Sequence, residues 1–285
     1  MLNYLKILIL HCLPQHKLSK LIHRLSRIEF KPFKNMLINT FIRIYNVDMR
    51  IAEYQNSNDY DSFNSFFTRK LKKNTRKWEI NNHLVLSPVD GQISQIGNIN
   101  NHRLIQAKRK KYNLEQLLGN DKNLAHEFKN GSFATLYLSP RDYHRIHMPV
   151  TGRLIKSIYI PGDLFPVNNS SVNNIDKLFS RNERFVSIFI TDIGLMAQIM
   201  VGAIFVGSME TVWSGEIIPN KKGEKIINDY KENNIKLVQG DEFGHFNMGS
   251  TVILLFQKNK IAWLSDKIKN VSINSGQSLG NIKIK

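Results

Sequence analysis

Hydrophobic and polar positions alternate in two different ways along the chain, and the change falls between residues 60 and 84. Before it, apolar residues recur three and four positions apart, which places them on one face of an α-helix. Two helices are predicted in this way, one around residues 17–27 and one around residues 37–45. Their apolar faces consist of Leu18, Leu21, Ile22 and Leu25, and of Leu37, Ile38, Phe41, Ile42 and Tyr45.

The first predicted helix carries basic residues opposite its apolar face, namely Lys17, Lys20, Arg24 and Arg27. A basic amphipathic helix is typical of segments that lie in a membrane interface, with their cations toward anionic headgroups. The same apolar faces would also suit helices that pack on the main domain, and the spacing fits both arrangements. We therefore expect residues 1–60 to form an N-terminal helical region, with membrane association as its predicted role.

From about residue 84 the pattern changes to short apolar runs separated by turn residues, which is typical of β-strands. Few long helical periods interrupt them. We predict an α+β fold, in which a β-rich antiparallel domain, sandwich-like or barrel-like, spans residues 61–285 after the N-terminal amphipathic helices. Phe63, Phe66 and Phe67 are predicted core anchors, and residues 220–234 a surface loop. The predicted strands are residues 133–138, 154–160, 185–190, 196–206 and 251–256.

Composition limits the kinds of protein that the chain can be. It has 285 residues, of which 42% are hydrophobic, so it is long and apolar enough for a globular core. The single cysteine, Cys12, excludes an internal disulfide and a cysteine-based zinc site. The formal net charge of +17 predicts an anionic partner, such as nucleic acid, acidic lipid headgroups or an acidic ligand, unless it reflects lysines scattered over the surface. Residues 5–13 are too few for a membrane-spanning helix, which needs about 20 apolar residues, and no signal-peptide cleavage site follows them.

Three short motifs carry side chains that can do chemistry. In Ser87-Pro88-Val89-Asp90-Gly91, a carboxylate stands in what is otherwise a hairpin-turn sequence. His144 and His147 lie three apart between arginines that would repel a cation, so acid–base chemistry is the better interpretation, unless both are plain surface side chains, and no metal is predicted. Gly249-Ser250 precedes an apolar run, either as an ordinary turn or with a reactive serine. Together an aspartate, a histidine and a serine are the parts of a nucleophile–base–orienter relay.

At these motifs the sequence resembles bacterial phosphatidylserine decarboxylases of the membrane-associated, pyruvoyl-dependent kind (prokaryotic type I), and the resemblance covers nearly the whole chain. Met248 stands where that family usually has leucine, while the Gly249-Ser250 pair is intact. Since methionine fills similar apolar space, we expect processing at this pair. The motifs that carry the resemblance are Phe66-Phe67-Thr68-Arg69, Ser87-Pro88-Val89-Asp90-Gly91, Tyr143-His144-Arg145-Ile146-His147-Met148-Pro149, Pro161-Gly162-Asp163-Leu164-Phe165, Leu178-Phe179-Ser180-Arg181-Asn182-Glu183-Arg184 and Phe246-Asn247-Met248-Gly249-Ser250-Thr251.

The resemblance implies that the chain makes its own cofactor, pyruvate, as a covalent pyruvoyl group derived from Ser250. It implies that the Ser250 hydroxyl attacks the carbonyl of Gly249, with His147 as general base. Asp90 would orient and stabilise that base, which completes a charge relay. The ester that forms would break by β-elimination, and hydrolysis would leave the pyruvoyl group with loss of ammonia. The implied products are a β chain, residues 1–249, and an α chain, residues 250–285.

The resemblance also implies the reaction, which is decarboxylation of phosphatidylserine to phosphatidylethanolamine through a Schiff base on the pyruvoyl group at Ser250. His144 is the candidate acid or base for this step, by its place in the motif. Implied partners are an anionic phospholipid membrane, phosphatidylserine, the β and α chains of one precursor and a second copy in a homodimer, with no nucleic acid. The implied location is peripheral, at the cytoplasmic face of the cell membrane. Two alternatives are a pyruvoyl decarboxylase of another amine-containing substrate, and a β-rich membrane- or nucleic-acid-binding module in which Ser250 is never cleaved.

Overall fold

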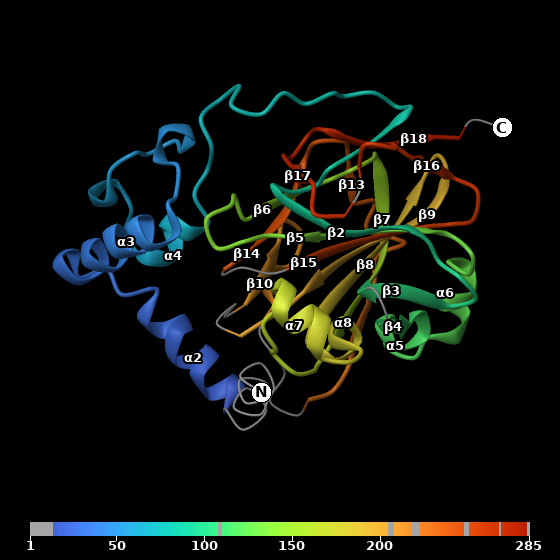
Figure 1. The fold of residues 1–285 in the computed structure, drawn as a ribbon, viewed down its shortest axis with the longest axis horizontal. Coiled ribbons are helices and arrows are strands. Elements are labelled where there is room, and N and C mark those ends of the chain that lie inside the picture. Colours follow the sequence, from blue (N-terminus) through green and yellow to red (C-terminus); the bar gives the residue numbers. More distant parts are fainter. Residues whose placement is uncertain are drawn as a thin grey trace.

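The molecule consists of a helical N-terminal part and a larger part built from β-sheets, which stand side by side in the computed structural model (Figure 1). Met248, Gly249 and Ser250 lie outside the described residues, as do Cys12 and the apolar stretch before it. None of the described helices is long and apolar enough to cross a membrane. The structure describes residues 14–107, 110–204, 208–217, 223–247, 251–267 and 269–283.

Short helical segments form the N-terminal part, as the spacing of apolar residues predicted. They are α2 (Gln15–Leu25), α3 (Lys31–Tyr45), the 3-10 turns η1 (Met49–Ile51) and η2 (Ser57–Asp59), and α4 (Phe63–Phe67). α3 has Pro32 in its first turn and ends at Asn46, which adopts a left-handed conformation. α4 begins at a capping box, in which the Ser62 and Ser65 side chains each accept a hydrogen bond from the other residue's backbone N–H. These local features fix where each segment begins and ends.

α3 and α4 share a small hydrophobic core of their own. Phe63, Phe66 and Phe67 are buried, which confirms them as core anchors. The ring centroid of Phe41 lies 5.2 Å from that of Phe63, and Ile38 of the same helix is fully buried. The apolar face predicted for the second helix therefore packs on this core through the buried Ile38 and the half-buried Leu37, Phe41 and Ile42, whereas Tyr45 is exposed.

The buried side chains of α2 are polar. Gln15 and Ser19 are its buried residues, whereas Leu21 is 52% exposed. Just beyond the end of the helix, the Arg27 Nη2 atom lies 2.7 Å from Glu216 Oε1 of the sheet part. The rest of the apolar face of α2, Leu18, Ile22 and Leu25, is half-buried, so this face is only partly covered and has no fully buried residue comparable to Ile38 of α3.

The largest sheet contains nine strands, and all of its pairings are antiparallel. Across the sheet the order is β12 (Ile226–Asp229), β7 (Gly152–Ile160), β8 (Arg184–Thr191), β9 (Gly194–Val201), β15 (Thr251–Phe256), β5 (Ser132–Tyr137), β2 (Gly91–Asn98) and β17 (Ser272–Ile273), and β13 (Lys236–Leu237) also pairs with β7. Every residue of β15 is buried, because its continuous apolar run packs on both faces of the sheet. The predicted strands are confirmed, although the one predicted for 196–206 ends at Val201.

Smaller sheets surround this one. A four-stranded sheet has the order β11 (Gly215–Ile217), β10 (Met209–Thr211), β14 (Glu242–Phe246) and β6 (Arg145–His147). A three-stranded sheet has the order β1 (Leu84–Leu86), β18 (Ser278–Ile282) and β16 (Ile261–Trp263), and β3 (Arg103–Ala107) pairs with β4 (Lys110–Asn113). The α+β class and the antiparallel β-rich domain are confirmed, and the sheets formed by the described residues do not close into a barrel.

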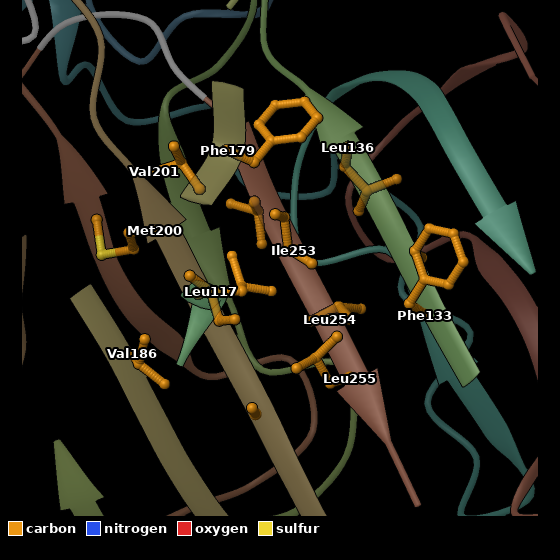
Figure 2. Packing of buried hydrophobic residues seen from close by; sticks show 14 of the residues in the cluster. Leu117, Phe133, Leu136, Phe179, Val186, Met200, Val201, Ile253, Leu254 and Leu255 are labelled. Carbon is orange, nitrogen blue, oxygen red and sulfur yellow. The ribbon is translucent and has the colours of Figure 1, made fainter. Parts of the chain in front are cut away.

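The main hydrophobic core lies on both faces of the nine-stranded sheet. On one face, Leu117 and Phe179 lie over Val201 and Ile253 (Figure 2). These two residues belong to the short helices α5 (Leu114–Leu117) and α8 (Leu178–Arg181), which accompany α6 (Lys122–Glu127) and α7 (Asn169–Asn174). On the other face, the Phe189 ring of β8 lies 6.1 Å, centroid to centroid, from the Phe243 ring of β14. The sheet is therefore covered on both sides, by short helices on one face and by the sheet that contains β14 on the other.

Two expectations from the local sequence are wrong. Asp90-Gly91 is not the turn of a hairpin, since β1 pairs with β18 while β2 pairs with β5 and β17. A Cβ at Gly91 would lie 2.2 Å from the carbonyl oxygen of Tyr137, so glycine is needed there for the close approach of two strands. Residues 226–229 are not a loop but the exposed edge strand β12, whose pairing with β7 outweighs their polar composition.

Candidate active site

The central strand β15 begins directly after the Gly249-Ser250 pair. Its first residue, Thr251, is fully buried and pairs with both neighbouring strands, β5 and β9. On the other side of the pair, Asn247 is 2% exposed and donates to Ser208, from its backbone N–H to the carbonyl oxygen at 3.1 Å and from Nδ2 to Oγ at 2.6 Å. Both residues that flank 248–250 are therefore fixed in the protein interior.

His147 ends β6 and is held as a neutral imidazole. Its Nδ1 lies 2.9 Å from the carbonyl oxygen of Gly240, which can only accept, so Nδ1 carries the proton. Its Nε2 therefore accepts from the Tyr143 hydroxyl, at 3.1 Å. Burial lowers the pKa of His147, against the charges of Glu242 and Asp90, which favour the protonated form. The neutral imidazole thus has its basic lone pair on Nε2, as a general base requires, and the Tyr143 hydroxyl must turn away before Nε2 can take a proton from another group.

Asp90 lies between β1 and β2 and is 5% exposed. It accepts hydrogen bonds from Arg76 Nε, at 2.9 and 3.1 Å, from Arg76 Nη2, and from the backbone N–H and hydroxyl of Ser275, at 2.8 and 3.0 Å. Trp78, from the same long loop as Arg76 (Figure 1), packs on His147 with ring centroids 4.7 Å apart. This loop therefore contacts both predicted relay residues. The hydrogen bonds between described residues do not join Asp90 to His147, so the orienting role of Asp90 stays a prediction.

His144 has a buried imidazole with one unused nitrogen. Its Nδ1 donates to the carbonyl oxygen of Asp142, at 2.8 Å, and its Nε2 has no hydrogen-bond partner among the described residues. The ring of Phe67 lies 4.1 Å away, centroid to centroid. Burial, and secondly the charge of Arg69, lower the pKa of His144 to about 3. The side chain is thus neutral near pH 7, so it must first receive a proton before it can donate one.

Two cavities open beside the beginning of β15, and Tyr137, which pairs with Thr251, lines both. We call the first, of about 400 Å³, the polar cavity and the second, of about 300 Å³, the apolar cavity. The polar cavity is lined by Asn46, Asp48, Ile51, Arg69, Arg76, Asp90, Gly91, Gln92, Tyr137, Ser139, Arg141, Asp142, Tyr143, Ser272, Ile273 and Asn274. The apolar cavity is lined by Phe41, Tyr45, Phe67, Tyr137, Leu138, Pro140, Pro166, Val167, Asn168, Ala203 and Ile204. The two cavities therefore lie between the helical part and the end of the sheet at which β15 begins.

Sequence reasoning missed several residues of this region. Arg76 and Trp78 come from a loop without hydrophobic periodicity, and Ser275 lies 185 residues from its partner Asp90. Tyr143 directly precedes His144 in the motif that contains both histidines, and this position was the one sign in the sequence that it belongs to the site. Among the described residues, no group of three or more His, Cys, Asp or Glu side chains is placed to hold a metal ion.

Comparison with known proteins assigns the chain to a family. The family model described as phosphatidylserine decarboxylase matches residues 63–281. The chain belongs to the phosphatidylserine decarboxylase family. A second model, described as PSD, matches residues 5–46, so the N-terminal helical region also has counterparts among known proteins.

Curated relatives extend this likeness to almost the full chain, and three of them are each named phosphatidylserine decarboxylase proenzyme. The one from Nitrosococcus oceani is 47% identical over 281 residues, which are 98% of this chain and 92% of the relative. The one from Coxiella burnetii is 47% identical over 95% of this chain and 96% of its own. The one from Alkalilimnicola ehrlichii is 47% identical over 98% and 96%. The word proenzyme indicates that these relatives are made as precursors.

Proposed function

We propose that this protein is a phosphatidylserine decarboxylase, a carboxy-lyase that converts phosphatidylserine to phosphatidylethanolamine and carbon dioxide. The observation that carries this proposal is the match to that family over residues 63–281, together with an intact Gly249-Ser250 pair in front of the central strand. A pyruvoyl decarboxylase of another amine-containing substrate is not favoured, because the relatives share one name.

The precursor is proposed to cleave itself between Gly249 and Ser250. In this step the Ser250 hydroxyl attacks the Gly249 carbonyl, and Nε2 of His147 takes the hydroxyl proton. The neutral tautomer of His147, with its proton held on Nδ1 by a backbone carbonyl, supports this role. The carboxylate of Asp90 is proposed to stabilise the imidazolium that forms, since its charge favours the protonated form of His147.

Cleavage at this position would leave the two chains joined by the fold. Residues 250–285, the proposed α chain, contain β15, β16, β17 and β18, which lie in two different sheets. β15 is bonded on both sides to strands of the proposed β chain, residues 1–249. The new chain end would therefore stay in place at the edge of both cavities.

The residues at the beginning of β15 fit a covalent pyruvoyl group at position 250. Thr251 Oγ1, in the first residue of β15, is buried without a hydrogen-bond partner among the described residues, and so is Nε2 of the candidate acid His144. When present, such a group supplies a ketone that takes up the substrate amine and accepts the electrons released as carbon dioxide leaves. The role proposed for His144 is to take up a proton at Nε2 and return it to the substrate carbon. The approach of an anionic substrate supports this role, because a nearby negative charge raises the pKa of an imidazole.

Residues 1–60 are proposed to hold the enzyme on the cytoplasmic face of the cell membrane as a peripheral protein. Phe30, Met36 and Ile44 are 67%, 56% and 68% exposed, which is unusual for large apolar side chains in one short region. Basic residues of α2 lie close to this surface in sequence, and they would add electrostatic attraction to an anionic lipid surface. A homodimer is proposed from the family resemblance, and light scattering of the purified enzyme tests it.

Mass spectrometry of the purified protein tests self-cleavage. We expect two chains, residues 1–249 and 250–285, with a pyruvoyl group at the start of the smaller one, and the Ser250→Ala variant should remain a single chain. Ser170→Ala, at an exposed serine of α7, is the matched control and should be cleaved normally. His147→Ala and Asp90→Ala should block cleavage, and normal cleavage of both would contradict the relay. Decarboxylase activity of the wild type on phosphatidylserine vesicles tests the reaction itself.

A further inference from the structure

Arg69 is a buried cation with incomplete hydrogen bonding. It is 3% exposed and lines the polar cavity. Its Nη2 donates to the carbonyl oxygens of Arg141 and Asp142, at 2.9 and 3.4 Å, whereas Nε and Nη1 have no partner among the described residues. The guanidinium also lies over the Phe66 ring, 5.3 Å from its centroid, but a ring face does not replace two hydrogen-bond acceptors. Buried guanidinium donors without acceptors are costly, so an acceptor that entered the polar cavity would be stabilised there.

Arg184, at the start of β8, is an internal comparison for this observation. It is equally buried, at 3% exposed. All three of its guanidinium nitrogens donate to backbone carbonyl oxygens, those of Leu117, Asn182 and Gln116. This fold can therefore satisfy a structural arginine completely, and at Arg69 it leaves two nitrogens open.

The carboxylates around the polar cavity do not complete Arg69. The Asp90 carboxylate is engaged by Arg76, and that of Asp142 by the Ser139 backbone N–H at 2.7 Å. Among the described residues, no carboxylate forms an ion pair with Arg69. Each of the three carboxylates in the cavity wall is paired with another arginine. Asp90 pairs with Arg76, Asp142 with Arg141, and Asp48 with Arg50, which lies outside the wall.

We propose that Arg69 binds the phosphodiester of the phospholipid substrate in the polar cavity. This inference rests on the proposed function and assigns one part of the same site. Guanidinium donors match the oxygens of a phosphate well, and the phosphate keeps its charge throughout the reaction. The substrate carboxylate is the wrong group for this position, because a cation on it would stabilise the charge that must be lost as carbon dioxide leaves.

The positions of the cavities agree with this assignment. Tyr137 lies between them and pairs with Thr251, so the reacting end of the substrate at position 250 would be near both. The phosphodiester would then lie on the Arg69 side, and the apolar cavity, lined by Phe41 and Phe67, would receive apolar parts of the lipid. A phosphodiester at Arg69 would also offset the positive charge that disfavours protonation of the neighbouring His144.

Kinetics of the cleaved enzyme with a soluble short-chain phosphatidylserine test the role of Arg69. The Arg69→Gln variant should have a KM about 10- to 100-fold higher than the wild type, as expected for the loss of charged hydrogen bonds, with kcat nearly unchanged. Lys70→Gln removes an exposed positive charge one residue away and should leave KM unchanged. An Arg69→Gln enzyme with the KM of the wild type would overturn the proposal.

Two competitors identify the group that Arg69 binds. Glycerophosphocholine carries a phosphodiester but no carboxylate, and L-serine carries a carboxylate but no phosphate. Inhibition by glycerophosphocholine should weaken about tenfold or more in Arg69→Gln, while inhibition by L-serine should be the same in both enzymes. The opposite result would place the carboxylate at Arg69 and refute the assignment.

A further variant keeps the test decisive if Arg69→Gln does not fold or self-cleave. Arg69→Lys retains the charge with fewer donors, so it should cleave normally, with a smaller rise in KM and weaker inhibition by glycerophosphocholine. If Arg69→Lys matches the wild type in both, the proposal fails. A wild-type enzyme without activity on phosphatidylserine would instead contradict the proposed function, so the two failures are distinguishable.

Discussion

The nine-stranded sheet and the N-terminal helices bury their side chains in opposite ways. In the sheet part, every residue of β15 is buried, and even Glu183 and Arg184 are only 4% and 3% exposed. In the helical part, Phe30 and Ile44 are 67% and 68% exposed. Of the thirteen exposed large apolar side chains among the described residues, seven lie between residues 21 and 54, although the sheet part is several times longer.

This difference indicates that the two parts obtain their stability from different surroundings. The sheet part buries its apolar surface internally, on both faces of one sheet. The helical part buries one set of side chains in the α3–α4 core and leaves another set outside, which suits a surface that continues into a lipid. Substitutions in the two parts should therefore affect different measurements, namely unfolding in one and vesicle binding in the other.

The largest effect is expected from Leu254→Ala in β15. Leu254 is fully buried, so its loss should lower the free energy of unfolding by about 2–5 kcal/mol. Denaturant unfolding in a Ser250→Ala background, in which the chain should stay in one piece, measures this. Leu21→Ala, at a 52% exposed position of α2, is the matched control and should change it by less than about 0.5 kcal/mol. Equal decreases in the free energy of unfolding for Leu254→Ala and Leu21→Ala would contradict the view that the sheet part and the helical part bury their apolar side chains differently.

The next effect concerns the buried acid Glu183. Burial raises its pKa from 4.5 to about 7, although the Tyr159 hydroxyl donates to it at 3.0 Å. The folded state therefore holds the proton more tightly than the unfolded state, and the free energy of unfolding should fall as the pH rises from about 4.5 to 7. Glu183→Gln should remove this fall and be more stable than the wild type at pH 8 by about 3 kcal/mol. Unfolding curves measured from pH 4 to pH 8 test this, and parallel profiles for the two proteins would contradict it.

A smaller effect, on binding and not on folding, is expected at Phe30. Phe30→Ser should weaken binding to anionic phospholipid vesicles about tenfold, because the apolar ring no longer enters the lipid. The free energy of unfolding should stay within about 0.5 kcal/mol of the wild type. Val212→Ser, at a 53% exposed position of the sheet part, is the control and should bind vesicles as the wild type does. Equal weakening by both would show that vesicle binding is not confined to the helical part.

The smallest effect is expected at an exposed lysine of α2. Lys20→Gln should weaken binding to anionic vesicles about fivefold, since one cation near such a surface contributes about 1 kcal/mol. The difference should shrink at high salt, because ions screen the attraction. Lys236→Gln in β13 removes a similar exposed charge from the sheet part and should have little effect. If the loss of vesicle binding in Lys20→Gln did not depend on salt, Lys20 would act by packing on the membrane and not by its charge.

Sequence patterns predicted those helices and strands that show a clear apolar pattern within their own residues. The run at 251–256 is apolar at five of its six positions and β15 has these same bounds, while the spacing of Leu18, Leu21 and Leu25 predicted α2. Which strands pair could not be predicted, because pairing joins distant segments, as β1 and β18 show. A turn-like sequence at Asp90-Gly91 was therefore mistaken for a hairpin, although it connects two sheets.

The candidate site was predictable only where side chains with reactive groups stand in a family motif. Asp90, His144 and His147 were predicted in this way. The incomplete hydrogen bonding of Arg69 could not be found, because it depends on which carbonyl oxygens the fold brings near. The contact between Arg76 and Asp90 likewise depends on the course of a long loop over the sheets (Figure 1).

Because β15 is a central strand, the order of folding and cleavage matters. As one chain, residues 250–285 are tethered to the strands they must join, so folding is independent of protein concentration. After cleavage at Ser250, the same strand would have to find its neighbours from solution, and refolding would depend on the concentration of both pieces. Since β15 lies between β9 and β5, neither piece can complete the nine-stranded sheet alone. The enzyme would thus fold while it is still inactive, and once denatured in its mature form it would not readily return.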